Sequence, residues 1–217
     1  VAVEKMDFDI EEGSLVTLLG PSGCGKSTLL SIMGLLDSPT KGDYWLNGSP
    51  AAELSASQRA RIRNREIGFI FQAFNLIGDL TVFENVAFGP RVNRFQGDLG
   101  RLVEECLRKA GLWTEVSDRL FEAASRLSAG QQQRLSIARA LAVGPEVLLM
   151  DEPASHLDPG AAHRIEELIH ALKQEYTVVL VTHNIQQAAR VSDLTAVFHQ
   201  GRLVEYGPTS SIFTNPR

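Results

Sequence analysis

The chain has 217 residues, of which 44% are hydrophobic, enough to bury the interior of one large domain. Lysine and arginine total 21 against 26 aspartates and glutamates, and this net charge of -5 argues against nucleic acid as a partner. No apolar run approaches the roughly 20 residues that cross a bilayer, and no charged-then-apolar leader opens the sequence, so we expect neither a membrane span nor a secretion signal.

Short β-rich runs alternate with helical patterns along the chain. This alternation predicts an α/β fold with a mostly parallel sheet flanked by helices, with strands at 15–19, 67–71, 147–150 and 177–182. Helices are predicted at 99–110, 131–142 and 159–174, the last with Asp158 as its N-cap and Pro159 at its first position. The sequence "TAVFHQGRLVEYG" predicts a hairpin that turns at Gln200 and Gly201.

Strand signals fade between residues 73 and 142. We therefore predict one domain over 1–217, in which a helical lobe at 80–142 is inserted into an α/β core made of 1–79 and 143–217. The basic run "RARIRNR" lacks interleaved aromatics and spreads its arginines over opposite helix faces, which favours a solvated helix over a nucleic-acid patch.

Two cysteines are too few for a disulfide framework, so a reducing cytoplasm fits this chain. Cys106 shares helical spacing with Val103, Leu107 and Ala110, which predicts a core position. Cys24 lies in a glycine-rich loop, where we expect it to be more exposed.

That loop, "GPSGCGKST", stands between a predicted strand and a predicted helix. Its glycines allow backbone N–H groups to turn around a phosphate, the helix N-terminus faces the same point, and Lys26 adds a full positive charge. A chance match to the phosphate-loop pattern is the alternative, but the strand and helix on either side favour a nucleoside triphosphate site. The predicted nucleotide-binding residues are Gly20, Pro21, Ser22, Gly23, Cys24, Gly25, Lys26, Ser27 and Thr28.

Polar side chains follow three buried strands. "EVLLMDEP" ends in Asp151, suited to a magnesium ion that Ser27 also binds, and Glu152, suited to polarising a water. The strand "VVLVTHN" ends at His183 on the same sheet edge, and Gln72 closes "IGFIFQ". An acidic turn and a structural histidine are the alternatives, and the nearby phosphate loop favours a catalytic edge.

The segment "LSAGQQQR", at 127–134, forms a second helix N-terminus fit for an anion. If it serves the same nucleotide and cannot reach it within one chain, two chains would pair head to tail around two nucleotides. The alternative is a capped helix that binds nothing.

Together these motifs resemble the ATP-binding subunit of ABC transporters, whose fold is a P-loop NTPase with a RecA-like core. "GPSGCGKST" is similar to the Walker A loop, Gln72 to the Q-loop residue, "LSAGQQQR" to the signature, "VLLMDE" to Walker B, "SHLD" to the D-loop and His183 to the switch histidine. They occur in the family's order and span nearly the whole chain.

The resemblance implies an ATPase that binds ATP with Mg²⁺ and closes as a dimer with a second copy of itself. It assigns catalysis to Glu152, His183 and Gln72, and the metal to Ser27, Gln72 and Asp151. The residues that would reach the partner's nucleotide in trans are Ser128, Ala129, Gly130, Gln131 and Asp158.

Two stretches of the chain suggest different cargoes. From "NVAFGPR" to "IFTNPR" the chain resembles ATPases of bacterial phosphate importers, whereas "LLSIMGLLDSPTKGDYWLNG" and "IRNREIGFIFQAFNLIGDLTVFENV" resemble those of the lipoprotein-release and macrolide-export group. The longer match favours phosphate import. This implies transmembrane permease subunits, a substrate-binding protein, and a peripheral position on the cytoplasmic side of the bacterial plasma membrane.

Three departures from the family pattern stand out. Ala129 replaces a glycine of the signature, which is expected to slow turnover, and His156 replaces an alanine of the D-loop. The sequence begins after the family's adenine-stacking aromatic, so we expect that an N-terminal portion precedes it.

Two other classes of ABC protein remain as alternatives. A soluble ABC protein acting on DNA or ribosomes is disfavoured because there are no paired cassettes, long coiled coils or basic inserts. A nucleotide-binding regulator without turnover is disfavoured because Glu152 and His183 are both present.

Overall fold

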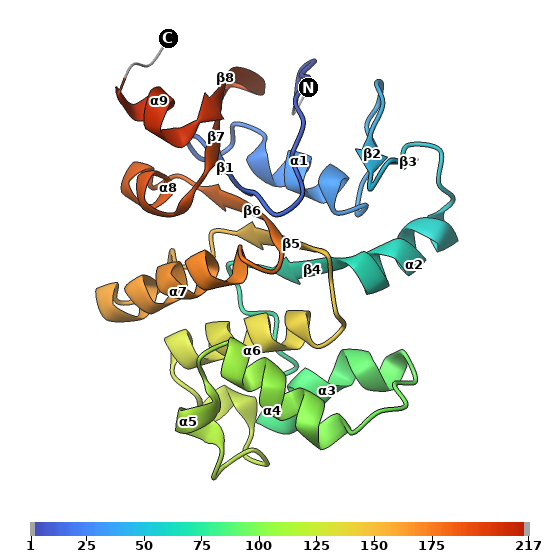
Figure 1. Cartoon of the computed structure of the whole chain (residues 1–217), viewed down its shortest axis with the longest axis vertical. Helices are drawn as coiled ribbons and strands as arrows, with labels where there is room; N and C mark the ends of the chain where they lie inside the picture. Colours follow the sequence, from blue (N-terminus) through green and yellow to red (C-terminus); the bar gives the residue numbers. More distant parts are fainter. Residues whose placement is uncertain (1–2, 215–217) are drawn as a thin grey trace. The chain divides into compact units, whose positions relative to one another are not determined.

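The structure is a computed structural model and describes residues 3–214. Within this range six strands form one sheet in the order β4-β5-β6-β1-β7-β8, and β2 and β3 form a separate hairpin (Figure 1). The strands β5, β6, β1 and β7 run parallel, while β8 is antiparallel to β7, so the predicted mostly parallel sheet is confirmed. The strand bounds are β1 Leu15–Leu19, β2 Trp45–Leu46, β3 Ser49–Pro50, β4 Ile67–Ile70, β5 Val147–Asp151, β6 Thr177–Thr182, β7 Leu194–His199 and β8 Arg202–Pro208.

The three helices predicted with explicit ranges are found as α4, α6 and α7. Among the described residues, none of the helices is both long and apolar enough to cross a membrane. The bounds are α1 Lys26–Met33, α2 Ala56–Glu66, α3 Val82–Val92, α4 Leu99–Lys109, α5 Trp113–Val116, a 3₁₀ turn at Ala124–Arg126, α6 Ala129–Leu141, α7 Pro159–Leu172, α8 Ile185–Val191 and α9 Thr209–Thr214.

The chain divides into two compact units. The first contains the residues up to Phe69, Glu146–Glu152 and the residues from Leu172 onward; the second contains Ile70–Pro145 and Pro153–Ala171. The segment 80–142, predicted as a helical lobe, falls inside the second unit. That unit also includes most of α7, which comes close to the start of α6: a Cβ placed on Gly130 would lie 2.8 Å from the Cβ of Ala161.

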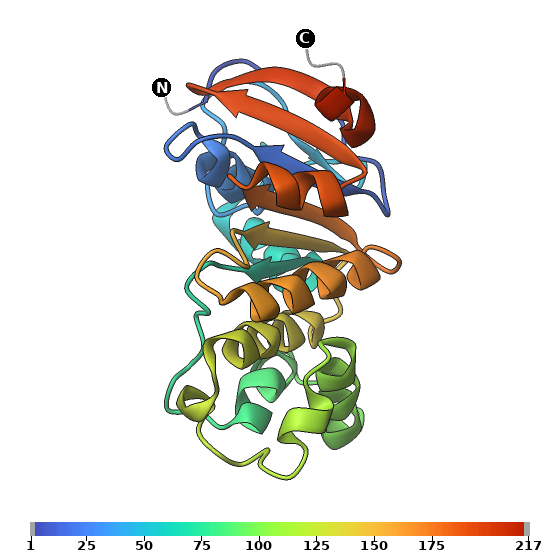
Figure 2. The same cartoon turned by 90° about the vertical axis from the view of Figure 1, so that its left-hand side faces the viewer.

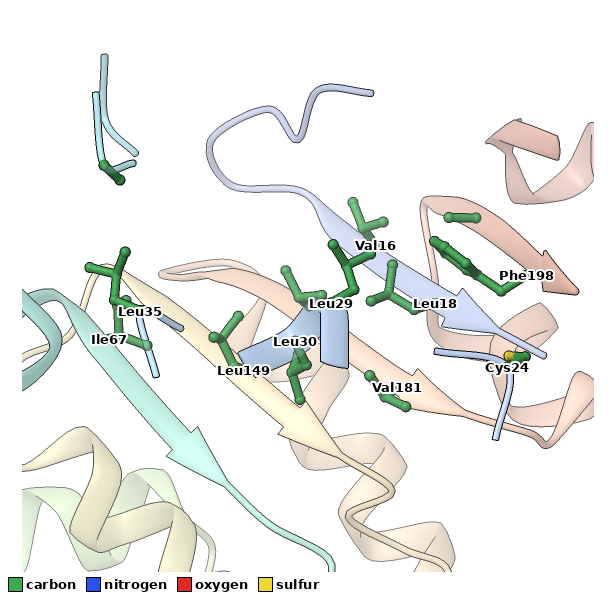
Figure 3. Close-up of a cluster of buried hydrophobic side chains, with 13 residues drawn as sticks. Val16, Leu18, Cys24, Leu29, Leu30, Leu35, Ile67, Leu149, Val181 and Phe198 are labelled. Atoms are coloured by element: carbon green, nitrogen blue, oxygen red, sulfur yellow. The ribbon is translucent and has the colours of Figure 1, made fainter. Parts of the chain in front are cut away.

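In the first unit the sheet carries a helix on each face. Val16 and Leu18 of β1 are fully buried against Leu29 and Leu30 of α1 (Figure 3). Thr17 points to the opposite face, where its hydroxyl bonds that of Ser192 at the end of α8. Figures 1 and 2 show α1 and α8 on opposite sides of β1 and β6. Burial on both faces of the sheet explains why every residue of β1 except Thr17 is apolar.

The C-terminal hairpin turns where the sequence predicts. Gln200 and Gly201 have φ values of 47° and 81°, the left-handed conformations that a two-residue turn between β7 and β8 requires. The predicted hairpin is confirmed.

The basic helix α2 has no buried residue, as predicted for a solvated helix. Two of its arginines instead hold the segment after α1: Arg63 donates to the carbonyl of Leu35 at 2.9 Å, and Arg59 bonds the hydroxyl of Ser38.

In the second unit, Asn85 of α3 organises the loop that precedes this helix. Its side chain is fully buried, and its Nδ2 donates to the carbonyls of Ile77, Leu80 and Thr81 at 3.2, 3.2 and 3.0 Å. Its Oδ1 accepts from the N–H of Ile77 at 3.1 Å. The loop has no regular secondary structure, so the side chain of Asn85 supplies hydrogen bonds that its backbone groups need.

Replacing Asn85 with alanine should therefore destabilise the protein markedly. The substitution removes the acceptor of the Ile77 N–H and one hydrogen bond at each of three carbonyls, which keep a backbone donor each. We therefore expect the free energy of unfolding to fall by about 1–3 kcal/mol. Denaturant unfolding measures this. The exposed amide Gln186 of α8 supplies the control, since Gln186→Ala should change stability by less than about 0.5 kcal/mol; equal effects of the two substitutions would contradict the role given to Asn85.

Candidate nucleotide-binding and catalytic site

The glycine-rich loop at 20–25 connects the buried strand β1 to α1. Gly23 and Gly25 have φ values of 77° and 101°, which only glycine adopts without strain, as the sequence predicts for these two positions. Gly25 is the N-cap of α1 and brings no side-chain hydrogen bond to the first turn. The N-terminus of α1 therefore relies on other groups to pair its N–H donors, which suits an anion.

Lys26 is anchored to this loop. Only 5% of the residue is exposed, and its Nζ donates to the carbonyl oxygens of Gly20 at 2.7 Å and Pro21 at 2.9 Å. The ammonium group thus lies inside the curl of the loop, where it concentrates positive charge beside the N-terminus of α1.

Gly20 and Cys24 differ from expectation. Gly20 has no positive φ; it is required for space, because a Cβ there would lie 2.4 Å from the carbonyl oxygen of Phe198 and 2.9 Å from the Sγ of Cys24. The expectation that Cys24 is more exposed is wrong: it is 4% exposed and belongs to the core cluster with Val16 and Phe198 (Figure 3). The loop turns the side chain of Cys24 inward, into the cluster that contains Phe198. The carbonyl of this same phenylalanine crowds Gly20. Cys106, in contrast, is buried as predicted.

Ser27 and Asp151 lie in contact. Asp151 is the last residue of β5, and the hydroxyl of Ser27 donates a hydrogen bond to its carboxylate. Burial raises the pKa of the Asp151 carboxyl and the charge of Glu152 raises it further, whereas the Ser27 bond and the charge of Lys26 oppose the rise. Two oxygen ligands beside the phosphate loop are the chemistry that Mg²⁺ prefers. Among the described residues no cluster of three or more His, Cys, Asp or Glu side chains is suited to a metal ion.

Glu152 and His183 form a pair at the adjacent strand ends. Glu152 has a φ of 46°, and its N–H donates to the carbonyl of Val181 at 2.9 Å, so the chain leaves β5 in a sharp turn. The Nδ1 of His183 lies 2.9 Å from the Oε1 of Glu152. Since an ionised carboxylate only accepts, Nδ1 carries the proton. Parallel pairing of Asp151 with Val181 brings the ends of β5 and β6 to one edge, as the sequence predicts.

Gln72 belongs to the second unit, and β4 ends at Ile70, before Gln72 rather than at it. The Nε2 of Gln72 lies 3.1 Å from the Nδ1 of His156 and 3.4 Å from its Nε2. The histidine that departs from the family's D-loop is therefore the hydrogen-bond partner of the Q-loop amide.

The signature segment forms the capped start of α6. Ser128 is the N-cap, and it exchanges hydrogen bonds with Gln131 in a capping box. Ala129 is the first helical residue and is exposed, so its methyl group causes no strain in the fold. Asp158 caps α7 in the same unit, accepting from the N–H groups of Gly160 and Ala161 at 3.0 Å each.

Glu115, a residue that the sequence motifs do not mark, lies beside the signature segment. Glu115 of α5 accepts a hydrogen bond from the Nε2 of Gln131 at 2.8 Å. Its distance from the motif along the chain hides this contact, and no pattern in the sequence marks it.

A family described as "ABC transporter" matches residues 3–155. The chain belongs to the ABC transporter family. It is an ABC ATPase, as its motifs predict.

Similar curated proteins include the phosphate import ATP-binding protein PstB of two strains of Bacteroides fragilis and of Bacteroides thetaiotaomicron. Each is 48% identical over 222 residues, which cover 99% of this chain and 87% of the relative. This ABC ATPase is thus similar to the phosphate importer group over nearly its full length.

Solved structures agree with the fold. The ATP-binding cassette MJ0796, as a dimer in a post-hydrolysis state with ADP and Pi, is 35% identical with a TM-score of 0.85, covering 96% of this chain and 90% of that one. The cbiO1 protein of Clostridium perfringens, part of the ABC transporter complex cbiONQ, is 27% identical with a TM-score of 0.89, covering 99% and 84%. The predicted ABC ATPase fold is confirmed.

The crowding at Gly20 generates a prediction. Gly20→Ala should lower the free energy of unfolding by about 1–3 kcal/mol, because the new methyl group must push the Phe198 carbonyl away from β1. Denaturant unfolding measures the loss. Gly78→Ala is the matched control, since Gly78 has open space around its Cβ position and no positive φ; a Gly20→Ala protein as stable as this control would contradict the packing argument.

Proposed function

We propose that this ABC ATPase energises phosphate import across the bacterial plasma membrane, bound peripherally on its cytoplasmic side. The observation that carries the proposal is 48% identity to phosphate import ATP-binding proteins over 99% of the chain. At the coarser level the chain is the ATPase subunit of an ABC transporter.

ATP would bind with its phosphates in the loop at 20–28. Lys26 supports this role because its ammonium is already held at the mouth of α1 by the carbonyls of Gly20 and Pro21. Exchanging those carbonyls for phosphate oxygens keeps the charge in place, so little rearrangement precedes binding.

The contact between Ser27 and Asp151 fits a Mg²⁺ site. When bound, the ion neutralises phosphate charge. Ser27 and Asp151 would hold the ion beside the phosphates that Lys26 binds.

Hydrolysis would use Glu152 and His183. A water oxygen forms a bond to the γ-phosphorus, the bond to the bridging oxygen breaks, and ADP leaves with that electron pair. Glu152 takes the proton of the water, and the Nδ1–H of His183, 2.9 Å away, fixes the carboxylate in orientation. The rate enhancement comes from positioning and electrostatics, because phosphoryl transfer to water requires little covalent chemistry from the protein.

A second copy of the chain would complete each site. Ser128, Ala129, Gly130, Gln131 and Asp158 are proposed to meet the nucleotide of the partner copy. Two similar structures are described as dimeric, one of them with ADP and Pi bound, which supports this arrangement.

Permease subunits are the proposed membrane partners. The segment after Gln72 carries five partly exposed apolar residues that could receive a permease helix: Phe74, Leu76, Ile77, Leu80 and Phe83. Asn85 fixes the backbone of this segment through Ile77, Leu80 and Thr81, so the segment can transmit a displacement.

The catalytic assignment predicts a strong effect of Glu152→Gln. Phosphate release from ATP should fall by about 10²–10⁴-fold, because the amide cannot take a proton from water, while ATP binding persists. Glu53→Gln is the control, since Glu53 is exposed and far along the chain from every motif residue. Hydrolysis at the same rate in both variants would rule out Glu152 as the base.

The cargo assignment is tested by transport. Co-purified with its permease and reconstituted in vesicles, the wild-type protein should drive ATP-dependent uptake of labelled phosphate, and the Glu152→Gln protein should not. ATP hydrolysis stimulated by a lipoprotein or a macrolide, without phosphate uptake, would instead support the export-type alternative.

A further inference from the structure

The carboxylate of Glu115 binds three donors in the second unit. Its Oε1 accepts from the Nη1 of Arg134 at 2.7 Å, and its Oε2 accepts from the Nη2 of Arg134 at 3.1 Å and from the Nε2 of Gln131 at 2.8 Å. A bidentate arginine fixes the plane of a carboxylate, so the contact to Gln131 has a defined direction.

This contact decides how the amide of Gln131 is oriented. A carboxylate only accepts, so it selects the nitrogen end of the amide. The oxygen end must then face the other way, where the N–H of Ser128 donates to it at 3.0 Å. The N–H of Gln131 in turn donates to the hydroxyl of Ser128 at 3.4 Å. Glu115 therefore holds the capping box that shapes the first turn of α6.

Arg134 anchors the carboxylate to the body of the second unit. It is 5% exposed, and besides Glu115 it donates to the carbonyls of Gly111 at 2.6 Å and Gly130 at 3.4 Å. The hydrogen bond from Arg134 lowers the pKa of the Glu115 carboxyl, and burial opposes this effect. The bond from Gln131 and the charges of Arg134 and Arg164 add to the lowering. Glu115 stays ionised at neutral pH.

The ion pair with Arg134 also neutralises the negative charge of Glu115. In the proposed dimer the start of α6 approaches the triphosphate of the partner copy, and an unpaired carboxylate beside it would repel that anion. The guanidinium of Arg134 balances this charge, so Glu115 can hold Gln131 without adding net negative charge near the phosphates.

We propose that Glu115 is a positioning residue for the nucleotide-facing end of α6, acting through Gln131 and Ser128. The proposal rests on the proposed function for what the segment meets, but the positioning itself is a property of the single chain and can be measured without nucleotide.

Hydrogen exchange of the isolated full chain tests the positioning. In Glu115→Gln the amide nitrogen of the new side chain faces other donors, so the capping box loses its support. We expect exchange at the backbone N–H groups of Gln131 and Gln132 to speed up by about tenfold, with the later turns of α6 unchanged. Glu122→Gln, an exposed glutamate of the same unit, is the control; exchange in Glu115→Gln equal to this control overturns the proposal.

The consequence for function is tested by ATP-dependent dimerisation in a Glu152→Gln background, which limits hydrolysis. Glu115→Gln should raise the dissociation constant of the dimer by about five- to tenfold relative to Glu122→Gln, while ATP affinity of the protomer is unchanged. If the protein without the Glu115 change fails to dimerise with ATP, the proposed dimer is wrong, and hydrogen exchange alone then decides the positioning.

A double substitution separates positioning from plain stabilisation. Glu115→Leu with Arg134→Met removes an ion pair whose arginine is buried and whose glutamate side chain is 38% exposed. Replacing both partners leaves neither charge without its partner. We expect the melting temperature of the double variant to lie near that of the parent protein while the fast exchange and the weak dimer persist. The double variant could instead match the parent protein in melting temperature, in slow exchange and in tight dimerisation. Glu115 would then have only a structural role, and the proposal would be overturned.

Discussion

The turn from β1 to α1 depends on the contact between the Lys26 ammonium and the carbonyl oxygens of Gly20 and Pro21. This contact exists only because the loop is tight. There is no room for a side chain at Gly20 beside the carbonyl of Phe198, and Cys24 is buried in the adjacent core cluster. The buried end of β1 sets where the loop starts, and the helix that follows sets where its amides point. Positive charge is thus fixed at one place before any anion arrives, which is the condition for electrostatic preorganisation.

The polar residues of the motifs do not act singly, because each has a partner within its own unit. Glu152 is paired with His183, and Ser27 with Asp151, in the first unit. In the second unit Gln72 is paired with His156, and Gln131 with Glu115. Such partners fix the orientation of amides and carboxylates, whose chemistry depends on which atom faces the substrate.

Ala129 and His156, the two residues within the motifs that we expect to depart from the family pattern, have different structural consequences. Ala129 begins a helix and exposes its methyl group, so the fold accepts it without strain. His156 gains a hydrogen bond to Gln72 that an alanine could not make. The departure at residue 156 therefore changes the surroundings of the Q-loop amide, whereas the one at 129 leaves the backbone of α6 as a helix.

The sequence by itself determined the strands of the six-stranded sheet, three of the helices, the C-terminal hairpin and the family, since these follow from periodicity, turn residues and motifs that are local in the chain. It also indicated that Asp151 and His183 share a sheet edge, because parallel strands end together. It did not indicate the short hairpin of β2 and β3. Only the tertiary structure decided that Cys24 is buried, that Gly20 serves space rather than backbone conformation, and that Asn85 pairs the loop before α3. It alone revealed Glu115 beside Gln131 and His156 beside Gln72. The contacts of Gly20 with Phe198 and of Gln72 with His156 join residues far apart in the chain, whereas those of Asn85 and Glu115 are closer in sequence. All of them depend on packing and hydrogen-bond geometry, which leave no periodic trace in a sequence.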